Sequence, residues 1–368
     1  RRQGHMSLSA GIVGLPNVGK STLFNALTQG SAEASNYPFC TLEPNIGVVE
    51  VPDARLRDLE ELLHPDSCTS TAIHFTDIAG LVEGASRGEG RGNEFLANVR
   101  DVDALLHVVR CFSDPTVSHI ADDLDPLRDI AVVESELMLA DLQILEGTLP
   151  DLEKRVSTDS HSTRVLELEV LRRIEAAILE GTPASSLALT SEEEAAVRGY
   201  NFLSAKPVLY VANVDEGSAG DGGRWFQQVA GRLGEDRVLA ISAQIEAEIG
   251  QLPTEERAEF LGELGLELRG LDRLVEATYR LLGLLTFYTL ANAKLQAWQL
   301  PRGMHAPQAA GKIHTDMERG FIRAEVATCG DLLKAGSAGK LREAGRLRTE
   351  GRDYEVADGD VVHFLFKA

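Results

Sequence analysis

The sequence predicts an α/β protein with a doubly wound sheet, an inserted helical arm and a small C-terminal module. Three observations lead to this expectation. Short apolar runs alternate with helical patterns along much of the chain, which is typical of a doubly wound sheet. The alternation stops between about residues 126 and 205, where the sequence is helical and acidic. From about residue 284, short β-type runs separated by glycine turns indicate a mixed α+β module.

These changes in sequence pattern and composition predict the domain boundaries. The expected segments are a leader (1–6), the first part of the sheet domain (7–125), a helical coiled-coil insertion (126–205), the second part of the sheet domain (206–283) and the C-terminal domain (284–368). The leader, RRQGHM, carries charge but no apolar stretch follows it, so it does not resemble a secretory signal. We expect it to be a cloning scar, with the native start at Met6.

Individual elements follow from the same patterns. Apolar runs predict strands in the sheet domain at 8–14, 46–51, 72–78, 103–109, 207–213 and 238–242. A helix from Ser21 to Thr28 follows the first of them, with Leu23, Phe24 and Leu27 on one face. The C-terminal module has strand-like runs at 320–327 and 359–367.

The helical insertion carries two apolar stripes. The first is spaced 4-3-4-3-4, as in the seam of a coiled coil, and consists of Met138, Leu142, Leu145, Leu149, Leu152 and Val156. The second consists of Leu168, Leu171, Ile174 and Ile178. A polar turn at 157–163 lies between them, so we expect an antiparallel helical hairpin. Gly147 to Pro150 offers a stop, an N-cap and an early-turn proline, which predicts a break or kink in the first helix.

Composition excludes several classes of protein. The 368 residues are 43% hydrophobic and 25% charged, as in soluble globular proteins. The longest apolar runs are far shorter than the roughly 18 residues of a membrane span. The four cysteines, Cys40, Cys68, Cys111 and Cys329, form no Cys-x-x-Cys pair. This argues against a zinc site and a disulfide framework, and it favours a reducing cytoplasm.

The net charge of −21 is unevenly distributed. From residue 284 onward there are 12 Lys/Arg and 10 Asp/Glu, against 24 and 47 in the rest of the chain. The acidic body would repel nucleic acid at long range, and we expect no DNA partner. The C-terminal module is electrostatically distinct. It is either an RNA-facing surface or an ordinary mixed surface.

The stretch GLPNVGKS, residues 14–21, predicts a phosphate site. It matches Gly-x-x-x-x-Gly-Lys-Ser and lies between an expected strand and an expected helix, the context of a P-loop. Gly14 and Gly19 let the loop wrap closely, so that backbone N–H groups and the helix N-terminus face the phosphates. Lys20 would reach the β- and γ-phosphates, and Ser21 would join the Mg²⁺ shell. We expect nucleotide contacts from Asn17, Val18, Gly19, Lys20, Ser21 and Thr22. A glycine turn before a helix is the plain alternative.

A P-loop predicts partners further along the chain. Asp77 begins an Asp-x-x-Gly at the end of an expected strand and would hold Mg²⁺, usually through water. Thr41 lies between the P-loop and Asp77, where a switch residue would close on Mg²⁺; otherwise it is a solvated loop threonine. After Asp-x-x-Gly, Leu81 replaces the glutamine that orients water in Ras-type enzymes. Hydrolysis is therefore expected to be slow, or to rely on another group.

The stretch LYVANVDEG, residues 209–217, stands where a guanine-reading Asn-Lys-x-Asp would be. Glu216 is one methylene longer than the aspartate that accepts from guanine, and Val214 removes the lysine stem. Asn213 remains, and its amide oxygen could accept from an adenine amino group. Backbone amides near Ser242 and Ala243 are expected to line the base pocket. These changes by themselves indicate only that guanine selectivity is weakened.

Taken together, these residues resemble the Obg-like ATPase family, also called YchF-type proteins, an Obg-related branch of the translation-factor P-loop NTPases. The resemblance is carried by residues 11–28, 37–45, 77–86 and 107–112 in the sheet domain, and by 306–326 and 353–366 near the C-terminus. It spans residues 7–368. It implies an OBG-type nucleotide-binding domain with a coiled-coil arm, and a C-terminal TGS domain of β-grasp type.

The resemblance also implies roles for single residues. Obg-type proteins carry a hydrophobic residue where Leu81 stands, and the Asn-x-x-Glu pattern goes with a preference for ATP over GTP. Asn17 matches the asparagine associated with K⁺-stimulated hydrolysis, in which K⁺ stands in for an arginine finger. His119 aligns with the proposed catalytic histidine, although from the residues alone it is only a histidine after a strand and a proline turn. Arg87 and Arg91 are further candidates to meet phosphate charge.

Three functions remain open at this point. The first is a slow ATPase that acts on the ribosome, contacting it through the coiled-coil arm and the TGS domain, as the resemblance implies. The second is an Obg-type GTPase with a degraded guanine motif. The third is a nucleotide-gated binding module whose hydrolysis only resets its state.

Overall fold

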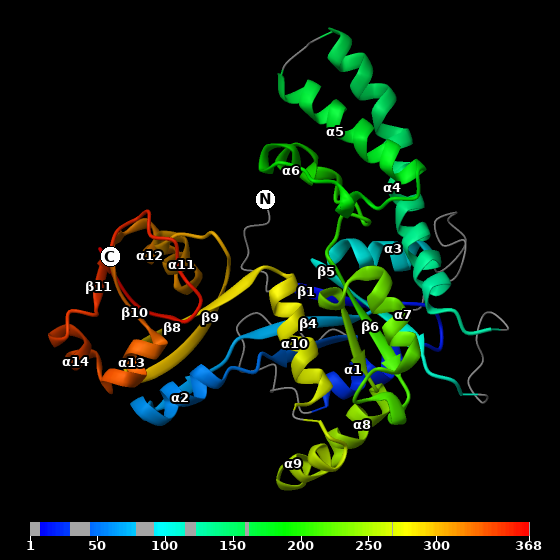
Figure 1. The fold of residues 1–368 in the computed structure, drawn as a ribbon. Coiled ribbons are helices and arrows are strands. Elements are labelled where there is room, and N and C mark those ends of the chain that lie inside the picture. Colours follow the sequence, from blue (N-terminus) through cyan, green and yellow to red (C-terminus); the bar gives the residue numbers. More distant parts are fainter. Residues whose placement is uncertain are drawn as a thin grey trace. The chain divides into compact units, whose positions relative to one another are not determined.

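The computed structural model describes residues 8–29, 45–78, 92–114, 123–158, 162–266 and 268–367. They fall into two compact units. The larger unit lies within 9–47 and 75–271, and the smaller within 48–74 and 272–368, together with Leu8. Figure 1 labels most of the elements of both.

The larger unit is built on a sheet with the strand order β2-β4-β1-β5-β6-β7. The strands are β1 (Ser9–Val13), β2 (Ile46–Glu50), β4 (Ala72–Asp77), β5 (Ala104–Cys111), β6 (Val208–Val214) and β7 (Val238–Ile241), and β2 and β4 run on into the smaller unit. β1, β5, β6 and β7 are mutually parallel, and every residue of β5 is buried. A parallel strand covered on both faces reads as a continuous apolar run, which is how β5 reads in the sequence. The doubly wound sheet and its expected strands are confirmed.

Helices alternate with these strands. Those of the larger unit are α1 (Lys20–Thr28), α3 (Gly92–Asp101), α4 (Pro126–Thr158), α5 (Ser162–Leu179), α6 (Ser191–Val197), α7 (Gly223–Leu233), α8 (Ala243–Gln251) and α9 (Thr254–Glu263), and α10 (Gly270–Leu281) continues into the smaller unit. Short 3₁₀ turns lie at η3 (Ala184–Ser186), η4 (Arg198–Tyr200), η5 (Glu216–Ser218) and η6 (Glu235–Arg237).

The expected hairpin is formed by α4 and α5, which lie side by side in Figure 1. Their facing stripes make one hydrophobic cluster, whose buried members include Met138, Leu145, Leu149, Leu152, Leu171, Ile174 and Ile178. Leu142, Val156 and Leu168 pack against it and are partly buried. The seam expected from the 4-3 spacing is confirmed.

The expected break near Gly147 to Pro150 does not end the helix. α4 is continuous from Pro126 to Thr158, with Pro150 inside it. A proline there removes one backbone hydrogen bond and crowds the preceding turn. Leu149 and Leu152 are buried against α5 on either side of the proline, so the packing of the hairpin offsets that local cost.

A buried carboxylate ties the arm to the chain that returns from it. Asp141 of α4 is 0% exposed. Its two oxygens accept from the backbone N–H groups of Leu203 (2.7 Å) and Ser204 (2.8 Å) and from the Ser204 hydroxyl (2.7 Å). Burial raises the pKa of Asp141, while these hydrogen bonds oppose that rise. The stretch before β6 is thereby fixed to the middle of α4.

The smaller unit is a mixed sheet in the order β11-β10-β12-β8-β9-β3. β8 with β9, β10 with β12 and β10 with β11 are antiparallel, whereas β12 with β8 and β3 with β9 are parallel. The strands are β3 (Ser67–Thr69), β8 (Leu284–Ala291), β9 (Lys294–Pro301), β10 (Phe321–Thr328), β11 (Arg348–Glu350) and β12 (Asp360–Phe366). The helices are α2 (Ala54–Leu63), α11 (Ala306–Ile313), α12 (Thr315–Arg319), α13 (Cys329–Ala335) and α14 (Ala338–Glu343). The mixed C-terminal module and its two expected strands are confirmed.

This sheet has hydrophobic residues on both faces. On one face, Phe287, Val326 and Phe364 pack with the alanines of α11. On the other, Tyr288 and Leu295 pack with Leu56 and Leu59 of α2 and with residues of α13 and α14. The C-terminal core is therefore completed by a helix from residues 48–74.

The structure thus groups residues 48–74 differently from the expected domains. The sequence predicts this segment to be part of the sheet domain, but it clusters with residues 272–368. β3 adds a strand beside β9, pairing Ser67 with Lys294 and Thr69 with Gln296. A strand of three residues is too short to show an alternation of apolar and polar residues. The sequence therefore indicates neither this strand nor the strand with which it pairs.

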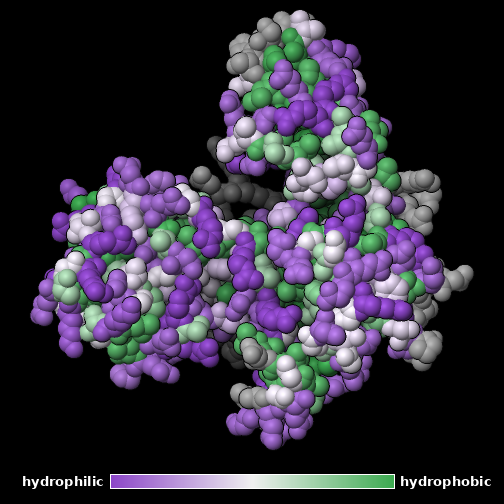
Figure 2. All heavy atoms as spheres, in the orientation of Figure 1, coloured by the Kyte–Doolittle hydropathy of each residue, from purple (hydrophilic) through white to green (hydrophobic). Residues whose placement is uncertain are grey.

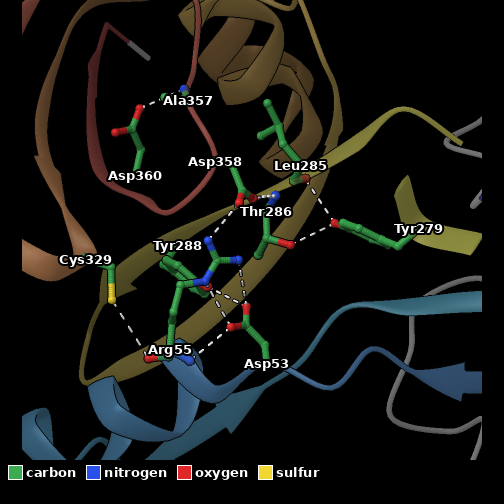
Figure 3. A network of polar contacts seen from close by, with 10 residues as sticks. All are labelled: Asp53, Arg55, Tyr279, Leu285, Thr286, Tyr288, Cys329, Ala357, Asp358 and Asp360. Atoms are coloured by element: carbon green, nitrogen blue, oxygen red, sulfur yellow. Dashed lines mark hydrogen bonds and ion pairs between the residues drawn. The ribbon is translucent and has the colours of Figure 1, made fainter. Parts of the chain in front are cut away.

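A polar network joins the same segment to the C-terminal residues (Figure 3). Asp53 caps α2 by accepting from the Arg55 backbone N–H (3.0 Å), and it also accepts a hydrogen bond from the Tyr288 hydroxyl. The Arg55 guanidinium binds Asp53 (3.1 Å) and Asp358 (2.8 Å). Asp358 in turn accepts from the backbone N–H of Thr286 (2.9 Å).

The visible face in Figure 2 is mainly hydrophilic, with hydrophobic residues interspersed. Over the residues that the structure describes, no helix combines the length and the apolar character of a membrane span.

Candidate functional site

The P-loop connects β1 to α1, as expected, and its backbone conformation explains its glycines. Gly14 and Gly19 have φ of +147° and +97°, which favour glycine. A Cβ on Gly14 would lie 2.4 Å from the carbonyl oxygen of Val108, and one on Gly19 would lie 2.2 Å from Asn213 Nδ2. The loop is thus closely packed against Val108 of β5 and Asn213 near the end of β6. Asn17 also has a positive φ, of 63°.

Lys20 begins α1 and is 7% exposed. Its Nζ donates to the carbonyl oxygen of Leu15, 2.7 Å away, within the P-loop. Burial lowers the pKa of Lys20 to about 8, and the Asp77 carboxylate opposes that effect. The ammonium therefore lies at the loop that would receive phosphate groups, and burial makes it lose its proton more easily than an exposed lysine does.

Ser21 and Asp77 meet where a metal ion is expected. The Ser21 hydroxyl donates to Asp77 Oδ2 over 3.0 Å, joining the start of α1 to the end of β4. A hydroxyl and one carboxylate are hard oxygen donors of the kind that Mg²⁺ shares with phosphates and water. Within the described ranges, no group of three or more His, Cys, Asp and Glu residues could hold a metal. The donor set fits Mg²⁺ bound together with a nucleotide, and not an all-protein cage.

Asn213, at the end of β6, joins the P-loop to the loop after β7. It is 6% exposed. Its Nδ2 donates to the carbonyl oxygen of Val18 (2.9 Å), and its Oδ1 accepts from the backbone N–H of Ala243 (3.0 Å). The oxygen that we expected to face adenine therefore already has a protein donor. In this arrangement Asn213 fixes two loops relative to each other.

The other residues expected at the base lie at the ends of β6 and β7. Glu216 is exposed in η5. Ser242 is the N-cap of α8, where its hydroxyl accepts from the backbone N–H of Ile245 (3.4 Å). Val214 and Ala243 are buried.

These elements surround a cavity of about 1060 Å³. Of the residues expected to contact nucleotide, Asn17, Gly19, Lys20, Ser21, Thr22, Asn213, Val214, Glu216, Ser242 and Ala243 line it. Val18, within the P-loop, is buried and does not line it. The volume is of the order of small-molecule sites, which reach about 1,000 Å³.

Part of the cavity wall is formed by residues that the sequence did not indicate. Phe112, Ser113, Asp114, Asp215, Gly217, Gln244, Ala247 and Glu248 also line the cavity. One signal could have found the first three of them: they follow β5, and ligands in open α/β sheets bind beyond the carboxyl ends of parallel strands. β5 lies between β1 and β6, so its following loop belongs to the same edge.

Three expected residues, Thr41, Leu81 and His119, lie outside the described residues, as do Arg87, Arg91 and Cys40. Cys68, Cys111 and Cys329 are free thiols, and burial raises the pKa of each.

Two family models match the chain. The model described as "50S ribosome-binding GTPase" matches residues 9–140. The model YchF-GTPase_C, described as "Protein of unknown function (DUF933)", matches residues 284–367.

Similar proteins match along the whole chain. The "Ribosome-binding ATPase YchF" of Bacillus subtilis is 47% identical over 98% of this chain and 100% of that protein. Its namesake in Escherichia coli O157:H7 is 46% identical over 98% of this chain and 99% of that protein. The structure of the Schizosaccharomyces pombe "YchF GTPase" has a TM-score of 0.88 and 32% identity, and covers 99% of both chains. The two bacterial relatives are named ATPases, whereas the fission-yeast structure is named a GTPase.

Proposed function

Since the chain belongs to the YchF family, we propose that it binds ATP, hydrolyses it slowly to ADP and phosphate, and associates with the ribosome. The observation that carries this proposal is one cavity lined by both the P-loop and the altered base loop after β6, in which the lining residue Ser21 is hydrogen-bonded to Asp77. The bacterial relatives are named ribosome-binding ATPases.

The phosphates would be held at the N-terminus of α1. Lys20 would turn from the Leu15 carbonyl to the β- and γ-phosphates, and the backbone amides of the P-loop would bind the remaining oxygens. Ser21 and Asp77 would hold Mg²⁺, with Thr41 as a further ligand from outside the described residues. The ion, when bound, supplies positive charge next to the transferred phosphoryl group.

The base would lie against the ends of β6 and β7. Glu216 at the position of the guanine-reading aspartate, and Val214 in place of lysine, weaken selectivity for guanine, and the bacterial relatives, which are named ATPases, support adenine. Because Asn213 already bonds to both loops, its part in this preference would be to hold them in place.

Slow hydrolysis follows from the residue after Asp-x-x-Gly. Leu81 cannot hydrogen-bond to water, so water would be oriented by another group, for which the resemblance offers His119. Asn17, at its positive φ in the P-loop, would take part in stimulation by K⁺. Lys20 is the residue whose loss would abolish phosphate binding.

The ribosome would be contacted through the helical arm and the C-terminal module. The C-terminal residues carry a small excess of positive charge, unlike the acidic remainder of the chain. Binding through such a surface weakens as salt rises, because it releases counterions from RNA. A protein with this function would act in the cytoplasm, where ribosomes are found.

Calorimetry of ATP and GTP binding with Mg²⁺, first in K⁺ and then in Na⁺, tests the nucleotide. We expect tighter binding of ATP, and faster turnover in K⁺ in a parallel phosphate-release assay. Equal affinity for both nucleotides would overturn the ATP assignment and favour a GTPase, as the name of the fission-yeast structure suggests.

Co-sedimentation with ribosomes at increasing salt tests the partner. We expect salt-sensitive association that depends on nucleotide state. A Lys20→Ala or His119→Ala variant that binds ribosomes normally but is never released from them would favour the nucleotide-gated binding module, in which hydrolysis only resets the state. Absence of co-sedimentation in every nucleotide state would contradict the ribosome proposal.

A further inference from the structure

A buried arginine stands at the end of β5, beside the cavity. Arg110 is 5% exposed, and its Cα is paired with that of Asn213 across the parallel strands β5 and β6. Asn213 fixes the P-loop and the loop after β7. Arg110 occupies the same level of the sheet, where the third loop of the cavity begins.

The guanidinium of Arg110 is bonded to that loop at two points. Its Nε donates to the carbonyl oxygen of Phe112 (3.3 Å), and its Nη2 donates to the carbonyl oxygen of Asp114 (3.0 Å). Its Cζ also lies 4.7 Å from the centre of the Phe112 ring. One side chain thus sets both the backbone of residues 112–114 and the position of the aromatic ring.

The loop held in this way is part of the cavity wall. Phe112, Ser113 and Asp114 all line the cavity. By strand order, they lie between the P-loop after β1 and the base loop after β6. Phosphate groups would meet Lys20 and the P-loop amides, so an aromatic residue further along the wall fits an apolar part of the ligand, the nucleoside.

We propose that Arg110 is a positioning residue that holds Phe112 against the nucleoside half of a bound nucleotide. This inference rests on the proposed function, in which the cavity takes a nucleoside triphosphate. Arginine suits the role because its planar, multi-donor group binds two carbonyl oxygens while its face stacks on a ring. Lysine would keep the charge but could not make both contacts and the stacking together.

The test separates the nucleoside from the phosphates by using two probes. Affinities of the full chain for Mg²⁺–ATP and for Mg²⁺–tripolyphosphate are measured by calorimetry, for Arg110→Lys and for Phe112→Leu. We expect each variant to bind ATP about three- to tenfold more weakly, the range of one well-placed aromatic contact. Tripolyphosphate affinity should stay within about twofold, because the P-loop contacts remain.

The double variant and a control complete the design. Arg110→Lys combined with Phe112→Leu should lose no more ATP affinity than either single variant, because both remove the same wall. Arg224→Lys is the matched control: Arg224 lies 4.4 Å from the Trp225 ring, neither lines the cavity, and neither probe should change.

Two results would overturn the proposal. Unchanged ATP affinity in both single variants would show that Phe112 does not contact the nucleoside. An equal loss for ATP and tripolyphosphate would assign Arg110 to general support of the P-loop.

If the unmodified chain prefers GTP, the same comparison is made with GTP, so that the contact between Phe112 and the nucleoside is tested separately from the choice of base. Phe112 is only partly buried, so Phe112→Leu should fold normally. It therefore tests the contact with the nucleoside even where Arg110→Lys reduces the stability of the folded protein.

Discussion

At the scale of single residues, the site depends on side chains that bond to backbone groups of other loops. Asn213 reaches Val18 and Ala243, and Arg110 reaches Phe112 and Asp114. Amide and guanidinium groups suit this task because each offers several bonding points in a fixed geometry. The cavity is therefore shaped by residues that need not themselves touch a ligand.

Asn213→Ala should weaken binding of ATP and GTP by a similar factor. The substitution leaves the buried Val18 oxygen and Ala243 N–H without their partner, at a cost of about 1–3 kcal/mol, or about five- to 150-fold in affinity. Calorimetry with both nucleotides measures it. A loss confined to ATP would instead mean that Asn213 reads adenine directly.

His107 makes the stability of the larger unit sensitive to acid. It is fully buried in β5, and burial, with the nearby charge of Lys20, lowers its pKa from 6.5 to about 3. Below pH 6.5 the unfolded chain takes up a proton that the folded chain does not, so stability falls as pH decreases from 6.5 towards 3. The loss between pH 7 and pH 5 should be about 2 kcal/mol.

Urea unfolding at pH 7 and pH 5 tests this linkage. The His107→Gln variant has no group to protonate, so its stability should change less with pH than that of the unmodified chain. Equal pH dependence in the two proteins would show that His107 does not contribute.

At the scale of elements, tertiary packing decides the conformation of α4. Pro150 lies inside a helix that local rules would end or kink, and the seam with α5 keeps that helix continuous. Most helix stability in proteins comes from packing of an apolar face, and here that face has residues on both sides of the proline.

Pro150→Ala should therefore stabilise the arm. Alanine restores the missing N–H and removes the clash, and proline costs about 3 kcal/mol more than alanine in a helix interior. We expect slower hydrogen exchange of amides in α4, equivalent to about 1–3 kcal/mol, with unchanged ATP affinity. Pro183→Ala, ahead of η3 and outside any helix, is the control and should give no gain. Unchanged or faster exchange in α4 would contradict the account.

At the scale of the whole molecule, one compact unit is assembled from distant parts of the sequence. Residues 48–74 supply α2 and β3 to the unit that contains the C-terminal residues. The ends of this segment continue as β2 and β4 into the larger unit, and β4 ends at Asp77. β4, which ends at the expected magnesium ligand Asp77, therefore begins within the smaller unit, which also contains the C-terminal residues.

Leu59→Ala should destabilise the C-terminal core, although Leu59 lies far from it in sequence. Leu59 is fully buried among Tyr288, Leu295 and Leu341, and truncating such a leucine costs about 2–5 kcal/mol. Hydrogen exchange should accelerate in β10 and β12. Glu61→Ala, on the exposed side of the same helix, should change stability by less than about 0.5 kcal/mol. Acceleration restricted to β5 and β6 would contradict this grouping.

The sequence by itself determined the elements and the chemistry of the phosphate site. Periodic apolar residues specify β5 and the arm seam locally, and the P-loop spacing places Lys20 and Ser21 at a helix N-terminus. Only the tertiary structure decided which distant groups meet: β3 beside β9, Asn213 between two loops, Arg110 beneath Phe112, and Pro150 within a continuous helix. The physical reason is that local propensity acts over one or two turns, whereas these contacts form between surfaces that exist only once the chain has packed.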